Sequence, residues 1–334
     1  MKSEVFNQSR CAVLRAANLY YMEGCSQKEI AERLAVSVPT VSRLLKRAKE
    51  EGLISFVIPS PYRECLALET QLRESYGLEE VIVVPPDPEG DRDPMAVKRA
   101  VALEGARYIQ RVIRPHDILG VAWGGTMYEL IQYLNPCQRT EATFVTLHGS
   151  ITCCSGKFEV NTLVRRIAMA FGGRQYALAA PGLLESPQQL SALRRQRDIA
   201  HIFSLFEQIT ISASGIGSFF PQPTSPLSHL PYLSEEEFAS LSAHHPYGDI
   251  MLRFFDQNGA ECASELAART LAIDMETYRK IPHKLIVASG FEKAYTLQAA
   301  LRGSLADVLV LDYALALTLA QLDKVYPDIG SGAP

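Results

Sequence analysis

The 334-residue sequence lacks long apolar runs, paired cysteines and a catalytic pair of carboxylates, and each absence excludes a class of protein. A membrane-spanning helix needs about 20 consecutive apolar residues, and no such run occurs. The first residues also lack the apolar stretch and cleavage site of a secretory signal. The seven cysteines are odd in number and contain no CxxC pair, which argues against a disulfide framework or a structural zinc site. We therefore expect a cytoplasmic protein with reduced thiols, no metal and no membrane partner.

The net charge of −4 conceals an asymmetry along the chain. Residues 1–60 contain nine Lys or Arg and six Asp or Glu, a balance of +3, so residues 61–334 carry −7. A small basic segment joined to a larger acidic body is typical of a DNA-binding module fused to a separate domain. We expect a DNA-binding domain at residues 1–60, a linker helix at 61–79 and a larger domain at 80–334. The linker helix would either pair two subunits or pack on its own body domain.

The basic segment carries the start signals of two helices joined by a short turn. Ser26 and Glu29 form a capping-box pattern that starts a short helix, and Ser37 is a suitable N-cap for a longer one. An upstream helix at residues 8–23 supplies apolar packing partners. The pattern predicts a helix-turn-helix unit; the alternative is an ordinary helical hairpin with a solvated basic face. Residues 53–58 form a strand-like run, either a wing or the exit from the domain.

The polar side of the longer helix suggests how this unit would contact DNA. Residues near the N-terminus of a helix in the major groove meet base edges, and cations further along meet phosphates. We therefore expect Thr40, Ser42 and Arg43 to read bases, and we expect phosphate contacts from the lysines and arginine that follow. The predicted DNA-contact residues are Gln27, Ser37, Thr40, Ser42, Arg43, Lys46, Arg47 and Lys49. The implied partner is double-stranded operator DNA.

From Val81 onward, short apolar runs alternate with amphipathic helical stretches. The expected strands are Val81–Val84, Ile118–Ala122, Thr143–Leu147, Tyr176–Ala179, Ile209–Ala213, Leu285–Ala288 and Val308–Leu311. Unbroken Val/Ile/Leu runs between helices predict a Rossmann-like α/β domain with a parallel sheet covered on both faces. Residues 249–256 resemble a strand, and residues 257–259 resemble the turn that closes it into a hairpin. We expect this hairpin at the edge of the parallel sheet. Residues 87–93 form an exposed loop, and residues 221–231 form a loop long enough to serve as a lid.

Ligands of such sheets bind where strands end and helices begin. Gly124, Gly125 and Thr126 follow a strand and precede a helix, where backbone N–H groups and the helix dipole favour an anion. A purely structural turn would use similar glycines. Lys293 lies in the first turn of a later helix, where its charge opposes the dipole; a phosphate partner would explain it, and a solvated lysine is the alternative. His148 ends another strand, a place where a histidine is often structural.

These residues together resemble the SorC family of bacterial sugar-responsive transcription regulators. The resemblance covers nearly the whole chain and follows a fixed order of segments, namely 27–31, 39–48, 120–126, 214–217, 248–250, 255–259, 290–294, 300–303 and 309–312. It implies a body similar to sugar-phosphate isomerases and deaminases, which binds a phosphorylated sugar or a related metabolite. It also implies no cofactor, and assembly as a dimer of dimers on DNA.

The resemblance assigns roles within the body. Gly124, Gly125 and Thr126 would cradle the phosphate, and Lys293 would pair with it. The remaining assignments are Asp256 as the acceptor of hydrogen bonds from ligand hydroxyls, and His148 and Gly149 as the pocket wall.

Three functions follow from these features. The main hypothesis is a transcriptional regulator, a repressor of a carbohydrate-metabolism operon that a phosphorylated sugar or polyol releases from DNA. The alternative is a sugar-phosphate isomerase or deaminase-like enzyme with an accessory DNA-binding head, in which Asp256 or His148 would be the general base. A third possibility is a body that only oligomerises. The sequence favours the regulator, and not an enzyme.

Overall fold

The computed structural model describes residues 9–87, 93–136, 139–151, 159–228 and 232–325, without the side chains of 323–325. The chain forms two compact units that divide between Ser60 and Pro61, and each is described by itself. Most of the loop expected at residues 87–93 and part of the one expected at 221–231 lie outside the described residues. Within the described ranges, no helix is both long and apolar enough to cross a membrane.

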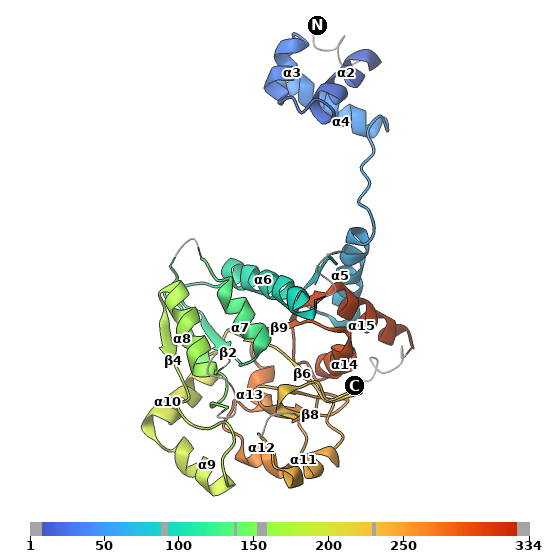
Figure 1. Ribbon diagram of the computed structural model, residues 1–334. Helices are drawn as coiled ribbons and strands as arrows, with labels where there is room; N and C mark the ends of the chain where they lie inside the picture. The colour runs from blue at the N-terminus through green and yellow to red at the C-terminus, as the bar shows by residue number, and fades with distance from the viewer. Residues whose placement is uncertain (1–8, 88–92, 137–138, 152–158, 229–231, 326–334) are drawn as a thin grey trace, which may run out of the picture. The chain divides into compact units, whose positions relative to one another are not determined.

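The N-terminal unit is a bundle of three helices, α2 (Arg10–Tyr21), α3 (Gln27–Arg33) and α4 (Val38–Glu50) (Figure 1). The capping box is present, because the Ser26 N–H donates to Glu29 Oε2 at 2.7 Å and the Glu29 N–H donates to Ser26 Oγ. Val13, Ile30 and Leu44 are fully buried at the centre of the bundle. The predicted three-helix unit is confirmed.

Residues 53–58 form no strand, so they are not a wing, and the alternative that they are the exit from the domain agrees with the structure. Among the described residues of this unit, no strand lies beside the segment. Phe56 instead packs its ring edge-on against Tyr21, with centroids 5.6 Å apart, and lies 5.1 Å from the ammonium group of Lys49. The segment leaves the helical unit as extended, exposed chain.

The body contains a parallel sheet of seven strands in the order β1-β10-β9-β5-β2-β3-β4. Its strands are β1 (Glu80–Val84), β2 (Ile118–Val121), β3 (Thr143–Thr146), β4 (Arg174–Tyr176), β5 (Ile211–Ser214), β9 (His283–Ala288) and β10 (Val308–Asp312). A small antiparallel sheet contains β6 (Gly217–Ser218), β7 (Gly248–Ile250) and β8 (Arg253–Phe255). The predicted α/β fold is confirmed.

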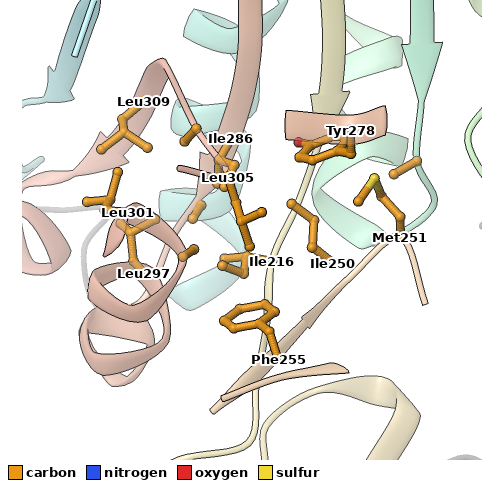
Figure 2. Packing of buried hydrophobic residues seen from close by; sticks show 14 of the residues in the cluster. Ile216, Ile250, Met251, Phe255, Tyr278, Ile286, Leu297, Leu301, Leu305 and Leu309 are labelled. Atoms are coloured by element: carbon orange, nitrogen blue, oxygen red, sulfur yellow. The ribbon is translucent and has the colours of Figure 1, made fainter. Parts of the chain in front are cut away.

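Helices cover both faces of the parallel sheet, as its apolar strands require. One face packs against α6 (Pro94–Val112), α7 (Gly125–Gln132) and α8 (Val160–Phe171), which lie side by side in Figure 1. The other face buries residues of α5 (Tyr62–Tyr76), α10 (Arg197–Phe206), α13 (Met275–Arg279), α14 (Ala294–Arg302) and α15 (Tyr313–Val325). Figure 2 shows Ile216 and Phe255 in the same cluster as Leu297 and Leu301 of α14. The remaining described helices are α9 (Pro187–Arg194), α11 (Glu235–Ser242), α12 (Glu265–Arg269), η1 (Pro226–Ser228) and η2 (Phe291–Lys293).

Helix α5, expected as a linker, packs on its own body. Cys65, Leu68 and Leu72 are buried in the cluster that covers the sheet, and α5 lies against β1 and α15. The Glu69 carboxylate also accepts a hydrogen bond from the Val83 N–H at 2.9 Å. The helix is therefore an integral element of the larger unit.

Two expected strands differ from the structure. The fourth strand spans Arg174–Tyr176 instead of the expected Tyr176–Ala179, and it goes no further because the Leu178 N–H donates to the Thr146 hydroxyl and so leaves the backbone ladder. The turn expected at residues 257–259 is present and joins Phe255 to Glu261 in an antiparallel bridge, but it belongs to the small sheet and not to the edge of the parallel sheet. The sequence missed a second turn, at Met251 and Leu252 between β7 and β8, with φ of 53° and 65°. Such turns usually contain Asn-Gly, so the sequence carried no signal for this one.

The strand order creates a switch point between β2 and β5. From β2 the chain proceeds outward to β3 and β4, whereas from β5 it proceeds to β9 and β10 on the other side. Crevices outside the carboxyl ends of strands at such a point are the usual ligand sites of open parallel sheets.

Candidate functional site: a phosphate-sized pocket and a basic helix

A pocket of about 150 Å³ lies at this switch point. Its walls come from the segments after β2 and β5, the small sheet, α6 and the end of η2. The lining residues are Lys98, Ala122, Trp123, Gly124, Gly125, Thr126, Gly215, Ile216, Gly217, Thr224, Ser225, Pro226, Asp249, Ile250, Met251 and Lys293. The structure thus brings Gly124, Gly125, Thr126 and Lys293 together, as the sequence predicted.

The segment after β2 presents backbone groups to the pocket. Gly124 has φ of 126°, a conformation that side-chain-bearing residues rarely adopt, and α7 begins at Gly125. A Cβ atom on Gly124 would have no heavy atom within 4 Å, so the space beside it is open. Thr126 lies in the first turn of α7. The first N–H groups of a helix have no partner within the helix, and together with the helix dipole they stabilise an anion. The start of α7 therefore makes this side of the pocket suitable for a negatively charged group.

Two lysines from elements that are distant in the sequence, Lys98 and Lys293, line the pocket. Lys98 comes from α6, and its Nζ lies 3.8 Å from the position of a Cβ on Gly125. Lys293 is the last residue of η2. Its pKa is lowered by burial and, to a smaller extent, by the neighbouring charge of Lys98. Neither ammonium group makes a hydrogen bond or ion pair with a described residue. Sequence reasoning missed Lys98, because only the fold brings α6 beside the glycine loop.

Asp249 provides a buried carboxyl group opposite these cations. The side chain is 4% exposed, and its Oδ1 accepts a hydrogen bond from the Ser225 hydroxyl at 2.5 Å. Burial raises the pKa of Asp249 to about 6, although the Ser225 hydrogen bond and the charge of Lys293 oppose the shift. A Cβ on Gly217 would collide with this carboxyl group, which explains the glycine there. The sequence contained Asp249 in a family segment but gave no reason to assign it to the pocket.

Asp256 does not line this pocket, so its expected role as the acceptor of hydrogen bonds from ligand hydroxyls does not belong to the glycine-loop site and stays a prediction. Its Oδ1 accepts hydrogen bonds from the N–H groups of Asn258 at 2.8 Å and Ala260 at 3.0 Å. These bonds fix the turn after β8. The family resemblance assigned Asp256 to the ligand, and the sequence did not reveal that its carboxylate stabilises a local turn.

His148 and Gly149 lie behind the pocket, so the expectation that they form its wall is also wrong. His148 is fully buried, and burial lowers its pKa to about 4. Its Nε2 accepts from the Trp123 N–H at 3.0 Å, which places the proton of the neutral ring on Nδ1, next to the Gly149 carbonyl at 2.7 Å. His148 therefore holds the start of the glycine loop in place. Gly149 lies too close to the backbone of residues 180–182 for any side chain.

The basic face of α4 is largely free to meet DNA. Ser42, Arg43, Lys46 and Lys49 are exposed, as a helix inserted into a groove requires. Gln27 is half-buried at the start of α3. These side chains supply cations and hydrogen-bond donors of the kind that contact phosphates and base edges.

Most of the predicted DNA-contact residues also have partners within the helical unit, including Lys46, which lies 3.7 Å from Glu50, and Arg43, which donates to the Pro39 carbonyl. Thr40 is 2% exposed and its hydroxyl lies 2.8 Å from Ser37 Oγ, so the expectation that Thr40 reads bases is wrong. Ser37 uses the same hydroxyl to cap α4, by accepting from the Thr40 N–H. Arg47 pairs through Nε with Glu51 at 2.5 Å. Thr40, Ser37 and Arg47 therefore make contacts that stabilise the helical unit itself.

Comparisons with known proteins agree with this division of the chain. Residues 60–321 match the family model described as a putative sugar-binding domain, and residues 18–51 match region 4 of sigma-70. The deoxyribonucleoside regulator of Bacillus subtilis is 33% identical over 92% of this chain and 96% of its own length. The sorbitol operon regulator of Klebsiella pneumoniae is 31% identical over 89% of this chain and 94% of its own.

Solved structures show the same relationship. The full-length sorbitol operon regulator SorC from Klebsiella pneumoniae superposes with a TM-score of 0.71 at 29% identity, over 92% of this chain and 98% of that one. A probable sor operon regulator from Shigella flexneri superposes with a TM-score of 0.70 at 28% identity, over 77% of this chain and 99% of that one. Sequence, family models and fold lead to one conclusion: the chain belongs to the SorC family of transcriptional regulators with a sugar-binding domain.

Proposed function

We propose that this protein is a repressor of a carbohydrate-metabolism operon and that a phosphorylated sugar or polyol releases it from operator DNA. The observation that carries the proposal is the pair of ammonium groups, Lys98 and Lys293, beside the glycine loop in the pocket at the switch point. Regulators of sorbitol and deoxyribonucleoside genes among the relatives support a carbohydrate-linked role.

The charges of the pocket favour a phosphate ester over a free sugar. A phosphate monoester carries about −1.5 to −2 charges at neutral pH, which matches two ammonium groups and the N–H groups at the start of α7. A neutral sugar would leave Lys98 and Lys293 without a direct ion pair, although the carboxylates of Glu292, Asp312 and Asp249 lie near Lys293. Hydrogen bonds to charged groups contribute about 1.5–3 kcal/mol each, so the phosphate supplies much of the affinity.

The opposite side of the pocket suits the sugar hydroxyls. Asp249 and Ser225 already share a hydrogen bond there, and a ligand hydroxyl can donate to the carboxylate. A buried carboxyl group that is left unpaired is costly, so a ligand without a hydroxyl at this position binds less tightly. The site thus separates two tasks, with cations for the phosphate and Asp249 for the sugar.

Release from DNA follows from thermodynamic linkage. If the phosphate ester binds better to the arrangement that disfavours DNA, it weakens DNA binding, and DNA weakens effector binding by the same factor. Couplings of about 1–3 kcal/mol are typical, which corresponds to roughly 5- to 150-fold changes in affinity. We propose that the active assembly is a dimer of dimers, which size-exclusion chromatography with light scattering tests directly.

The enzyme hypothesis required Asp256 or His148 as a general base. Asp256 caps a turn outside the pocket, and His148 is held in one neutral tautomer behind the glycine loop. Neither is within reach of a ligand at the switch point. Sustained turnover of any sugar phosphate would nevertheless overturn the regulator proposal.

The decisive test measures DNA binding by fluorescence anisotropy, with an operator fragment selected from genomic DNA by the purified protein. Phosphate esters are compared with their parent sugars, in wild type and in the Lys98→Ala/Lys293→Ala variant, with Lys280→Ala as the surface-lysine control. We expect one ester to release wild-type protein, its parent sugar to fail, and the double variant to bind DNA without responding. Release by the parent sugar alone would contradict the phosphate role.

A further inference from the structure

A second and larger cavity lies on the other side of the segment that walls the phosphate pocket. It has a volume of about 680 Å³, within the range of small-molecule sites. Its lining includes Phe219, Phe220, Tyr247, Asp256 and Gln257. Gly217, Thr224 and Ser225 of the same segment line the phosphate pocket. Residues 217–226 therefore contribute to both sites.

Aromatic side chains in fixed orientations form the apolar wall of this cavity. The rings of Phe220 and Tyr247 stack with centroids 4.5 Å apart, and Tyr295 packs edge-on against Phe220 at 5.4 Å. Phe219 lies edge-on against Phe254 at 5.4 Å. Phe220 nevertheless remains 39% exposed. An exposed ring that its neighbours hold in place offers a flat apolar surface at little cost in conformational entropy.

Polar groups stand beside the aromatic wall. Asp256 uses Oδ1 for the turn, and Oδ2 makes no hydrogen bond to a described residue, so one carboxylate oxygen is available as an acceptor. Gln257 is exposed, and its side-chain amide is likewise without a described hydrogen bond. The lining contains His244 and His245 but neither lysine nor arginine. This composition suits hydroxyl groups and disfavours a phosphate, in contrast to the pocket at the switch point.

We propose that this cavity is a second ligand site, which binds the ring of a neutral sugar or cyclic polyol. Such a ring has an apolar C–H face, which fits against Phe220, and an edge of hydroxyl groups, which can donate to Asp256 and Gln257. Asp256 would then perform the hydroxyl recognition expected from the sequence, but away from the phosphate pocket. The proposal stands independently of the phosphate proposal, since the two sites use different side chains.

The test uses the full-length protein and a panel of methyl glycosides and cyclic polyols at tens of millimolar, with binding detected by saturation-transfer NMR and quantified by calorimetry. The variants are Phe220→Ala and Gln257→Ala at the cavity and Lys98→Ala/Lys293→Ala at the phosphate pocket. Phe56→Ala, which removes a phenylalanine of the N-terminal unit that is more exposed than Phe220, is the control.

We expect at least one neutral compound to bind wild type, the double-lysine variant and Phe56→Ala with equal affinity. Phe220→Ala should weaken that binding by at least about tenfold, and Gln257→Ala by a smaller factor, while both variants keep the far-ultraviolet circular dichroism of wild type. Two results would overturn the proposal. One is that no neutral ring compound binds; the other is that binding is lost in the double-lysine variant and retained in Phe220→Ala.

Discussion

The two buried titratable groups around the pocket at the switch point should change the free energy of unfolding in opposite directions as the pH rises. Asp249 has its pKa raised to about 6 from an ordinary value of 3.8, so the folded body retains the proton more tightly than the unfolded chain. Its contribution is present below pH 3.8 and is lost as the pH rises through 6. His148 has its pKa lowered to about 4 from 6.5, so its contribution is present above pH 6.5 and is lost as the pH falls through 4.

The size of each effect follows from the two shifts. A shift of one pH unit corresponds to 1.36 kcal/mol, so about two units give ~3 kcal/mol for each group. In wild type the two contributions largely cancel between pH 4 and 6.5. In Asp249→Asn, the His148 contribution remains alone, so the free energy of unfolding should rise by ~3 kcal/mol over this interval relative to wild type. In His148→Gln, it should fall by a similar amount relative to wild type.

The assay is urea unfolding of the full-length protein at several pH values. Trp123 is the single tryptophan and lines the pocket, so its fluorescence reports on the body. Subtracting wild type from each variant at the same pH removes the titration of all other groups. A difference that stays constant from pH 4 to 6.5 in Asp249→Asn would refute the burial argument.

Other predictions concern both units. Arg43→Ala should cost ~1–3 kcal/mol of operator binding and relax sequence preference at one position, as competition with altered operators would reveal; an equal loss on every DNA would show a phosphate contact. Thr40→Ala should lower the melting temperature of the N-terminal unit through loss of the contact with Ser37, ~1 kcal/mol, but should leave the ranking of operators unchanged; an altered ranking would restore Thr40 as a base reader. Gly149→Ala should destabilise the body by ~1–3 kcal/mol, because its Cβ would lie 2.5 Å from the Ala180 carbonyl oxygen; unchanged urea unfolding would contradict that packing.

Features that depend on neighbours in the chain were predictable from the sequence. The Ser26–Glu29 capping box, the Ser37 N-cap and the glycines after β2 each act over a few residues, and their roles or places agree with the structure. The apolar strands of the parallel sheet were predictable because both faces are buried, which leaves few polar residues within them.

Features that depend on the fold were not predictable. Lys98 and Asp249 meet the glycine loop only through the packing of α6 and the small sheet, so no spacing along the chain identifies them. The burial of Thr40 and His148 likewise comes from tertiary contacts that override the polar character of these residues. The turn at Met251 and Leu252 adopts positive φ without Gly or Asn, so local sequence preferences did not reveal it, whereas the turn expected at residues 257–259 is present between Phe255 and Glu261.

The central claim is that the pocket at the switch point recognises a phosphate group through Lys98 and Lys293. The most direct measurement is a calorimetric titration of the full-length protein with a panel of sugar and polyol phosphates and with the parent sugars. We predict that a phosphate ester binds wild type and that the Lys98→Ala/Lys293→Ala variant loses at least about a hundredfold in affinity for it, while Lys280→Ala binds normally. Equal affinity of the ester for wild type and the double variant would contradict the claim.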